Sequence, residues 1–182
     1  MARNVEIKAR LRDPAATRRL VERAAGERAA ELDQVDTFFR TPAGRLKLRE
    51  ATGQPPELIW YERPDATGPK ESHFEWAVVA DAAAVRALLA AALGVRVEVR
   101  KHRSVCLVGR TRVHLDAVEG LGDYLELEVQ LAPGESAEAG VREARELMGR
   151  FGVGEAELVA GAYADLLEAR DRSAGAPGGS AR

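Results

Sequence analysis

The sequence has little of several features that assign chains to common classes of protein. It has one cysteine, Cys106, so it forms no internal disulfide, which suits a reducing cytoplasm. It has no run of about 18 apolar residues, which excludes a transmembrane helix, and its first residues lack the apolar core of a signal peptide. Its 27 Lys and Arg against 29 Asp and Glu leave a formal charge of −2, which argues against a nucleic-acid-binding surface. These absences predict a cytoplasmic protein that contacts neither membrane nor nucleic acid.

The length of the chain limits the number of domains that it can form. At about 150 residues per domain, 182 residues predict a single domain that can bury a substantial core. We expect residues 1–170 to form this domain. Residues 171–182 are rich in Gly, Ser, Ala and Pro, a composition that predicts a disordered tail.

Short strands dominate the predicted secondary structure, because apolar and polar residues alternate with a period of two over much of the chain. Glycine and proline separate these segments. Strands are predicted at residues 4–12, 35–40, 45–50, 58–63, 74–79, 95–103, 105–118 (with a turn near Gly109) and 124–131. Helices are predicted at 14–31, 82–93, 136–151 and 155–170. This number of antiparallel-type strands predicts an α+β fold with a barrel or closed sheet and helices outside.

The polar faces of these strands are unusually rich in charge. A half-exposed sheet with one solvated face would show the same alternation. However, Arg45, Lys47 and Arg49 repeat without a break, and like charges on neighbouring positions repel unless something anionic lies there. The helices need the apolar faces to pack against, so we expect the charged faces to line a shared interior that holds polar ligands.

The charges on these faces indicate the kind of ligand. Arginine forks and lysine ammonium groups suit a chain of phosphates, and carboxylates suit Mg²⁺ or Mn²⁺. The sequence has no Gly-x-x-x-x-Gly-Lys loop, which excludes a P-loop enzyme. We therefore expect a site for metal and polyphosphate. Asp36 is interpreted either as a residue that orients an interior cation or as a surface residue. Trp60 and Trp76 are interpreted as packing residues, with stacking on an adenine ring as the alternative.

Seven segments, in this order, resemble the CYTH superfamily of triphosphate tunnel metalloenzymes, and the resemblance covers roughly residues 3–168. The segments are Val5-Glu6-Ile7-Lys8, residues 34–39, Gly44-Arg45-Leu46-Lys47-Leu48-Arg49-Glu50, Tyr61-Glu62-Arg63-Pro64, residues 99–103, residues 114–122 and Glu126-Leu127-Glu128. The resemblance implies a closed eight-stranded antiparallel barrel, open as a tunnel, with helices outside.

The resemblance also implies roles for individual residues. Glu6 and Lys8 fall on the last two residues of the family's Glu-x-Glu-x-Lys motif, and Asn4 stands where that motif has its first Glu. Lys8, Arg63 and Asp116 are the candidate catalytic residues. The candidate triphosphate-binding cations are Lys8, Arg45, Lys47, Arg49, Arg63, Lys101, Arg103 and Arg112. The candidate ligands of Mg²⁺ or Mn²⁺ are Glu6, Asp116, Glu126 and Glu128.

Three functions are compatible with these residues. The favoured one resembles a class IV adenylyl cyclase, which converts ATP to cyclic AMP and pyrophosphate. The second is a phosphohydrolase acting on inorganic triphosphate or thiamine triphosphate. The third is a non-catalytic sensor of nucleotide or polyphosphate, motivated by the uncharged Asn4. The sequence leaves the oligomeric state open, a homodimer included.

Overall fold

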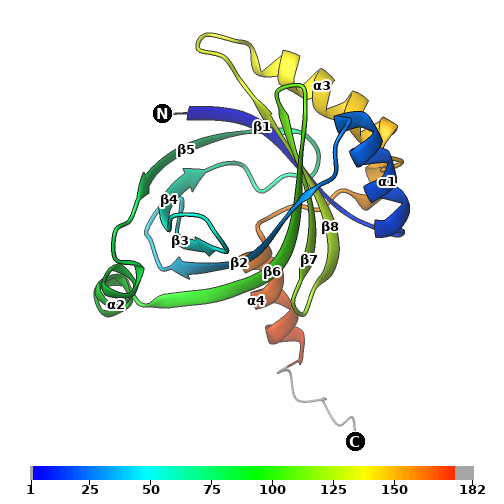
Figure 1. Cartoon of the computed structure of the whole chain (residues 1–182). Coiled ribbons are helices and arrows are strands. Elements are labelled where there is room, and N and C mark those ends of the chain that lie inside the picture. Colours follow the sequence, from blue (N-terminus) through cyan, green and yellow to red (C-terminus); the bar gives the residue numbers. More distant parts are fainter. Residues whose placement is uncertain (1, 175–182) are drawn as a thin grey trace, which may run out of the picture.

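The computed structural model describes residues 2–174 and shows one closed antiparallel barrel (Figure 1). Its strands are β1 (Ala2–Arg10), β2 (Ala30–Phe39), β3 (Arg45–Ala51), β4 (Glu57–Glu62), β5 (Lys70–Val78), β6 (Val95–Val108), β7 (Thr111–Val118) and β8 (Gly122–Gln130). They pair in the order β1-β5-β4-β3-β2-β6-β7-β8, and β8 closes onto β1. The predicted α+β class and closed eight-stranded barrel are confirmed.

Four α-helices lie outside the barrel: α1 (Pro14–Ala25), α2 (Ala82–Leu93), α3 (Ala137–Arg150) and α4 (Tyr163–Ala174). In Figure 1, α1 and α3 lie together outside the wall on the right, α2 lies at the lower left, and α4 lies below the barrel. Asp13 and Asp81 cap α1 and α2 by accepting a hydrogen bond from a backbone N–H in the first turn. Within residues 2–174 no helix combines the length and apolarity needed to cross a bilayer.

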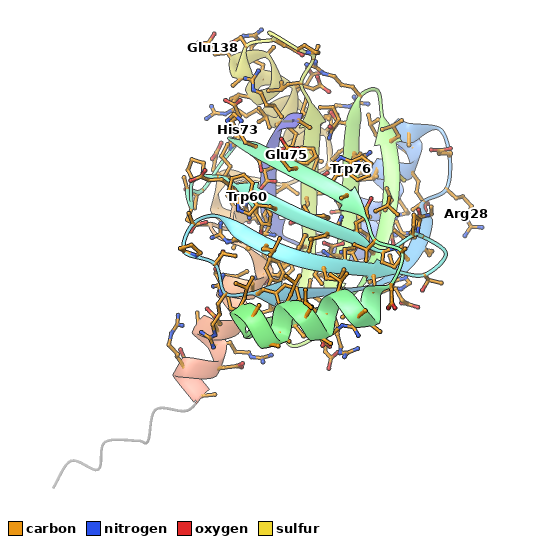
Figure 2. All side chains as sticks on the ribbon, turned by 90° about the vertical axis from the view of Figure 1, so that its left-hand side faces the viewer. Arg28, Trp60, His73, Glu75, Trp76 and Glu138 are labelled. Atoms are coloured by element: carbon orange, nitrogen blue, oxygen red, sulfur yellow. The ribbon has the colours of Figure 1, made fainter. Side chains whose placement is uncertain are left out.

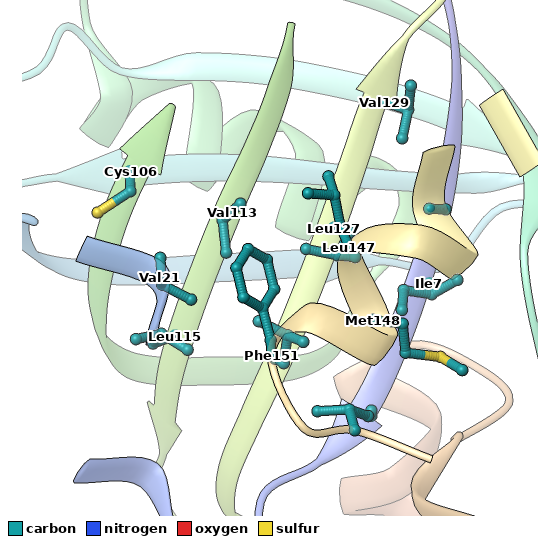
Figure 3. Close-up of a cluster of buried hydrophobic side chains, with 14 of the residues drawn as sticks. Ile7, Val21, Cys106, Val113, Leu115, Leu127, Val129, Leu147, Met148 and Phe151 are labelled. Atoms are coloured by element: carbon teal, nitrogen blue, oxygen red, sulfur yellow. The ribbon is translucent and has the colours of Figure 1, made fainter. Parts of the chain in front are cut away.

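The apolar face of β1, β7 and β8 packs against α1 and α3 to form the main hydrophobic core (Figure 3). Ile7 and Leu127 point outward into this core, where they lie beside Met148 and Leu147 of α3. Their neighbours along the strands are charged and point the other way, because successive side chains of a strand face opposite sides. Burial of the apolar face therefore fixes which charged residues enter the barrel.

Several predicted element boundaries are wrong. Helix α1 ends at Ala25 because Gly26 takes a left-handed conformation (φ 76°), and β2 begins at Ala30. Strand β6 runs unbroken from Val95 to Val108, whereas two strands were predicted there. Lys70–Val78 is strand from its first residue, although residues 70–73 were not predicted as strand.

The predicted helix at 155–170 is divided. Glu155–Glu157 forms a single 3₁₀ turn, and α4 begins only at Tyr163. Between them Val159 donates its backbone N–H to the carbonyl of Lys8, so the chain is held along β1 rather than coiled into a helix. Because α4 continues to Ala174, residues 171–174 are helical and do not belong to a disordered tail. The remainder of the predicted tail, residues 175–182, lies outside the described residues.

Two features of the backbone and its surroundings require glycine at position 44, in the turn before β3. Its φ is +65°, and a Cβ there would lie 2.7 Å from Nε1 of Trp60. We expect Gly44→Ala to lower the free energy of unfolding by about 1–3 kcal/mol. Gly53→Ala is the matched control, because Gly53 has φ +72° but open space where its Cβ would be. Urea denaturation of both variants checks this, and equal losses would contradict a role for the Trp60 contact.

Candidate functional site

The interior of the barrel holds a cavity of about 390 Å³. It is lined by charged side chains from seven of the eight strands and by Ala162 and Tyr163 at the start of α4. The charged lining residues are Glu6, Lys8, Asp36, Lys47, Arg49, Glu57, Arg63, Lys101, Arg103, Arg112, Glu126 and Glu128. The structure thus brings most of the predicted site residues into one cavity, and the exceptions are Arg45 and Asp116.

Asp36 on β2 organises the cations on β3. Its carboxylate accepts hydrogen bonds of 3.0 Å from Nζ of Lys47, Nε of Arg49 and Nε2 of Gln34. Asp36 is buried, and the opposing effects of desolvation, which raises its pKa, and of Arg49, Lys47 and Lys101, which lower it, leave the pKa well below its usual range. Of the two interpretations from the sequence, the structure supports the one in which Asp36 orients interior cations.

The cations at this end of the cavity are crowded and desolvated. Burial and repulsion from Arg49 lower the pKa of Lys47 to about 7, although Asp36 opposes this effect. Burial and repulsion from Arg103 likewise lower the pKa of Lys101. Because both effects penalise positive charge, a bound anion would relieve them.

A second cluster surrounds Arg103 at the inner end of the cavity. Its Nε and Nη2 each donate to one oxygen of Asp116 at 2.6 Å, and Nη2 also donates to Oε2 of Glu126 at 2.5 Å. The other Glu126 oxygen accepts from Nζ of Lys8. Tyr163 donates its hydroxyl to Oδ2 of Asp116 at 2.9 Å, and its ring lies 3.4 Å from Nζ of Lys8.

Asp116 lies behind this cluster rather than in the cavity. It is 2% exposed, and the guanidinium of Arg103 and the hydroxyl of Tyr163 occupy both of its oxygens. Desolvation raises its pKa, but Arg103 and Lys101 outweigh this and hold the pKa at about 2. Asp116 therefore positions Arg103 in this structure. The metal-binding and catalytic roles that the resemblance implies for Asp116 stay predictions, and they would require it to exchange these contacts.

Arg45 also lies outside the cavity, and the phosphate-binding role that the resemblance implies for it stays a prediction. Its Nη2 pairs with Asp65 and Asp165 at 2.7 and 2.8 Å. Asp165 belongs to the first turn of α4, so Arg45 attaches this helix to β3. Arg112 does line the cavity, but its side chain is exposed at the rim.

Glu6, Glu126 and Glu128 form the acidic part of the cavity wall. Glu6 on β1 lies opposite Glu128 on β8, and Lys8 lies opposite Glu126. Glu6 pairs with Nη1 of Arg63 at 2.7 Å, yet burial and the two neighbouring carboxylates raise its pKa. His114 lies 3.8 Å from Glu128, and burial lowers its pKa to about 4, so it is neutral at pH 7.

Sequence reasoning missed two residues of this site. Tyr163 belongs to a segment read as an ordinary packing helix, and nothing in its sequence context indicates that α4 closes over the barrel. Lys70 is buried opposite Glu6, and desolvation together with Arg63 lowers its pKa to about 8. Residues 70–73 are all polar, so no alternation of apolar and polar residues could have indicated that Lys70 faces inward.

A closed antiparallel barrel with cations and carboxylates directed into its interior defines the class of triphosphate tunnel proteins. The sequence matches the CYTH domain over residues 2–163, and the chain belongs to this family. CYTH proteins are typically enzymes that act on triphosphates and use divalent metal ions. No curated protein matches the chain.

Several solved structures share this fold. The PH1012 protein of Pyrococcus horikoshii is 22% identical, with a TM-score of 0.79 and coverage of 90% of this chain and 98% of that one. A Vibrio parahaemolyticus protein provisionally described as an adenylate cyclase is 22% identical, with a TM-score of 0.70 and coverage of 91% and 97%. A Hippeastrum protein provisionally described as an adenylyl cyclase, with a dominant triphosphatase activity, is 15% identical, with a TM-score of 0.61 and coverage of 93% and 96%.

Proposed function

We propose that this protein is a divalent-metal-dependent enzyme that converts ATP to cyclic AMP and pyrophosphate, as class IV adenylyl cyclases do. The observation that carries the proposal is the cavity in which cations of β1, β3, β6 and β7, together with Arg63 just after β4, lie beside three glutamates. Seven cations and five carboxylates line it, and most of them pair with one another. The positive surplus suits a triphosphate whose charge a bound metal ion partly neutralises.

The donor set of the cavity fits Mg²⁺ or Mn²⁺ in its chemistry, because Glu6, Glu126 and Glu128 offer hard carboxylate oxygens. Burial raises the pKa of Glu6, and the neighbouring Glu126 and Glu128 raise it further, so a cation bound between these carboxylates would stabilise their charged forms. Within residues 2–174, no three His, Cys, Asp or Glu side chains are gathered into a ready-made metal site. Metal binding would therefore exchange ion pairs to Arg63, Lys8 and Arg103 for metal contacts.

Each part of the cavity has a role in this proposal. Lys47, Arg49, Lys101 and Arg103 bind phosphate oxygens, while Asp36 and Asp116 orient these cations. Glu6, Glu126 and Glu128 hold the metal ion, which would supply charge neutralisation at the phosphate oxygens. Lys8 and Arg63 lie beside the glutamates and stabilise the negative charge that develops during the reaction.

The reaction itself is a displacement at the α-phosphorus. The ribose 3′-oxygen forms a bond to this phosphorus, the bond from the α-phosphorus to the bridging oxygen of the β-phosphate breaks, and the hydroxyl proton passes to solvent. The chain's contribution is to fix the α-phosphorus against the 3′-oxygen, where a misplacement of about 1 Å would cost much of the rate.

Hydrolysis of a triphosphate is the alternative, and the description of the Hippeastrum structure favours it, since that protein has a dominant triphosphatase activity. In this case water attacks the γ-phosphorus of inorganic triphosphate or thiamine triphosphate. The two reactions can use the same cations and differ in which phosphorus lies near the nucleophile.

One experiment separates these functions. Purified protein is incubated with ATP, inorganic triphosphate or thiamine triphosphate, with Mg²⁺ or Mn²⁺ and with EDTA as the control, and the products are identified chromatographically. Cyclic AMP with pyrophosphate supports the cyclase, whereas orthophosphate supports hydrolysis. Binding without turnover would support a sensor, and turnover in EDTA would refute the proposed metal-dependent site.

The pKa of Lys47 makes triphosphate binding dependent on pH. A group with a pKa of about 7 in the free protein is charged below pH 7 and neutral above it, and a bound anion favours the charged form. Affinity is therefore expected to fall about tenfold as the pH rises from 7 to 8 and beyond. Lys47→Arg should remove this step, because a guanidinium stays charged. Both proteins are titrated with inorganic triphosphate, so the ligand's own ionisation contributes equally to the two pH profiles of affinity. Identical profiles for wild type and Lys47→Arg would contradict the prediction.

A further inference from the structure

One wall of the cavity is apolar rather than charged. Ile59 on β4 and Phe74 and Trp76 on β5 line it, and the register places Ile59 opposite Trp76 and Tyr61 opposite Phe74. Trp76 is 56% exposed although it lines the cavity, so it lies at an open mouth. Figure 2 looks onto this side of the barrel and shows Trp76 and Trp60 on the wall formed by β4 and β5. A planar ring entering the mouth would find an aromatic surface on this wall.

In the part of the chain that the structure describes, two amide side chains beside this wall each have one buried polar atom without a hydrogen-bond partner. Asn4 on β1 and Gln130 on β8 are direct cross-strand neighbours, and both line the cavity. Within the described residues, Oδ1 of Asn4 and Nε2 of Gln130 are buried and have no partner. Asn4 is only 5% exposed, so its unpaired oxygen costs stability unless a ligand or water satisfies it.

The amide pair lies beside the aromatic wall. Asn4 is opposite Ser72 on β5, and Ala2 is opposite Phe74, so the amides and the ring of Phe74 lie within two residues of each other along the strands. Two of the cavity's cations lie further along the chain from this mouth. Lys8 follows Asn4 by four residues on β1, and Arg63, just after β4, follows Ile59 by four residues.

We propose that this mouth binds the heterocyclic ring of an organic triphosphate, with the ring on Trp76 and its edge on Asn4 and Gln130. A carbonyl acceptor beside an amide donor complements a ring that presents an amino group next to a ring nitrogen. Asparagine and glutamine recognise adenine in this way. The 4-aminopyrimidine ring of thiamine has the same edge. The inference rests on the proposed function and narrows it, since inorganic triphosphate has no group for this mouth.

This ring-binding role explains why position 4 holds an amide rather than a carboxylate. A carboxylate at this position would only accept hydrogen bonds, and it would add a fourth negative charge to the glutamates further along β1 and β8. An amide adds no charge and is a weaker metal ligand than a carboxylate, but it can both donate and accept hydrogen bonds to an uncharged ring.

The first test uses the protein's own fluorescence. The chain has two tryptophans, so Trp60→Phe leaves Trp76 as the only tryptophan reporter. In EDTA, where binding without turnover is expected, ATP should quench most of the emission and inorganic triphosphate should change it little. Equal responses to the two ligands, or none to ATP at saturation, would overturn the stacking of the ring on Trp76.

The second test measures dissociation constants by calorimetry in EDTA for ATP, inosine triphosphate and inorganic triphosphate. Trp76→Ala is expected to weaken ATP binding about tenfold and to leave inorganic triphosphate unaffected, because stacking contributes only to ring binding. Wild-type protein should bind ATP about tenfold more tightly than inosine triphosphate. Where adenine has an amino donor beside a ring-nitrogen acceptor, the base of inosine has a carbonyl acceptor beside a ring N–H donor. Gln130→Ala should remove that preference.

Leu107→Ala is the control, since Leu107 is exposed on β6 and does not line the cavity. Equal loss of ATP and inorganic triphosphate in Trp76→Ala, or equal wild-type affinity for ATP and inosine triphosphate, would refute the inference while leaving the proposed function standing. Failure of all three ligands to bind would instead refute the proposed function, and the inference with it.

Discussion

Glu126→Gln is expected to lower metal-dependent turnover about a hundredfold while leaving triphosphate binding intact or tighter. Glu126 holds Lys8 and Arg103 in the free protein, and it is proposed as a metal ligand in the working one. The amide keeps the size of the side chain but loses the charge that makes it a strong metal ligand, and loss of such interactions typically costs 10–100-fold or more. The two cations that it releases become available to phosphate oxygens.

Rates at several Mg²⁺ and Mn²⁺ concentrations, together with binding constants in EDTA, check this expectation. Glu146→Gln is the control, because Glu146 is exposed on α3, outside the barrel. If Glu126→Gln lost triphosphate binding and turnover to the same extent, Glu126 would be a structural partner of Lys8 and Arg103 and not a metal ligand.

Arg103→Ala is expected to abolish triphosphate binding and also to destabilise the fold. Arg103 is 3% exposed and satisfies both oxygens of the buried Asp116. Removing it leaves that carboxylate with Tyr163 and a more distant Lys101, and breaking a buried ion pair in this way costs about 3–5 kcal/mol. Urea denaturation and calorimetric titration with inorganic triphosphate measure the two effects.

A double variant separates binding from stability. Arg103→Leu with Asp116→Leu removes both charges, so it should recover much of the lost stability without recovering binding. Recovery of both would show that Arg103 contributes only to folding. Arg142→Ala, on the exposed face of α3, should alter neither quantity.

Much of the fold follows from the sequence, because alternation with a period of two is a local property. Burying Ile7 and Leu127 under α1 and α3 leaves Glu6, Lys8, Glu126 and Glu128 with only the interior to face. Helix boundaries were less predictable. Residues 155–162 have a helical composition, but hydrogen bonding of Val159 to the backbone of β1 prevents a helix there.

The alternation of the sequence by itself determined which side chains enter the barrel, since neighbouring residues of a strand must face opposite sides. Only the tertiary structure decided how deep each one lies and what it contacts, because these depend on strand register and on elements distant in the chain. Register places Asp116 behind Arg103, and α4 brings Asp165 to Arg45 and Tyr163 to Lys8. It also places Asn4 beside Gln130, a pair 126 positions apart whose unpaired amides no local pattern reveals.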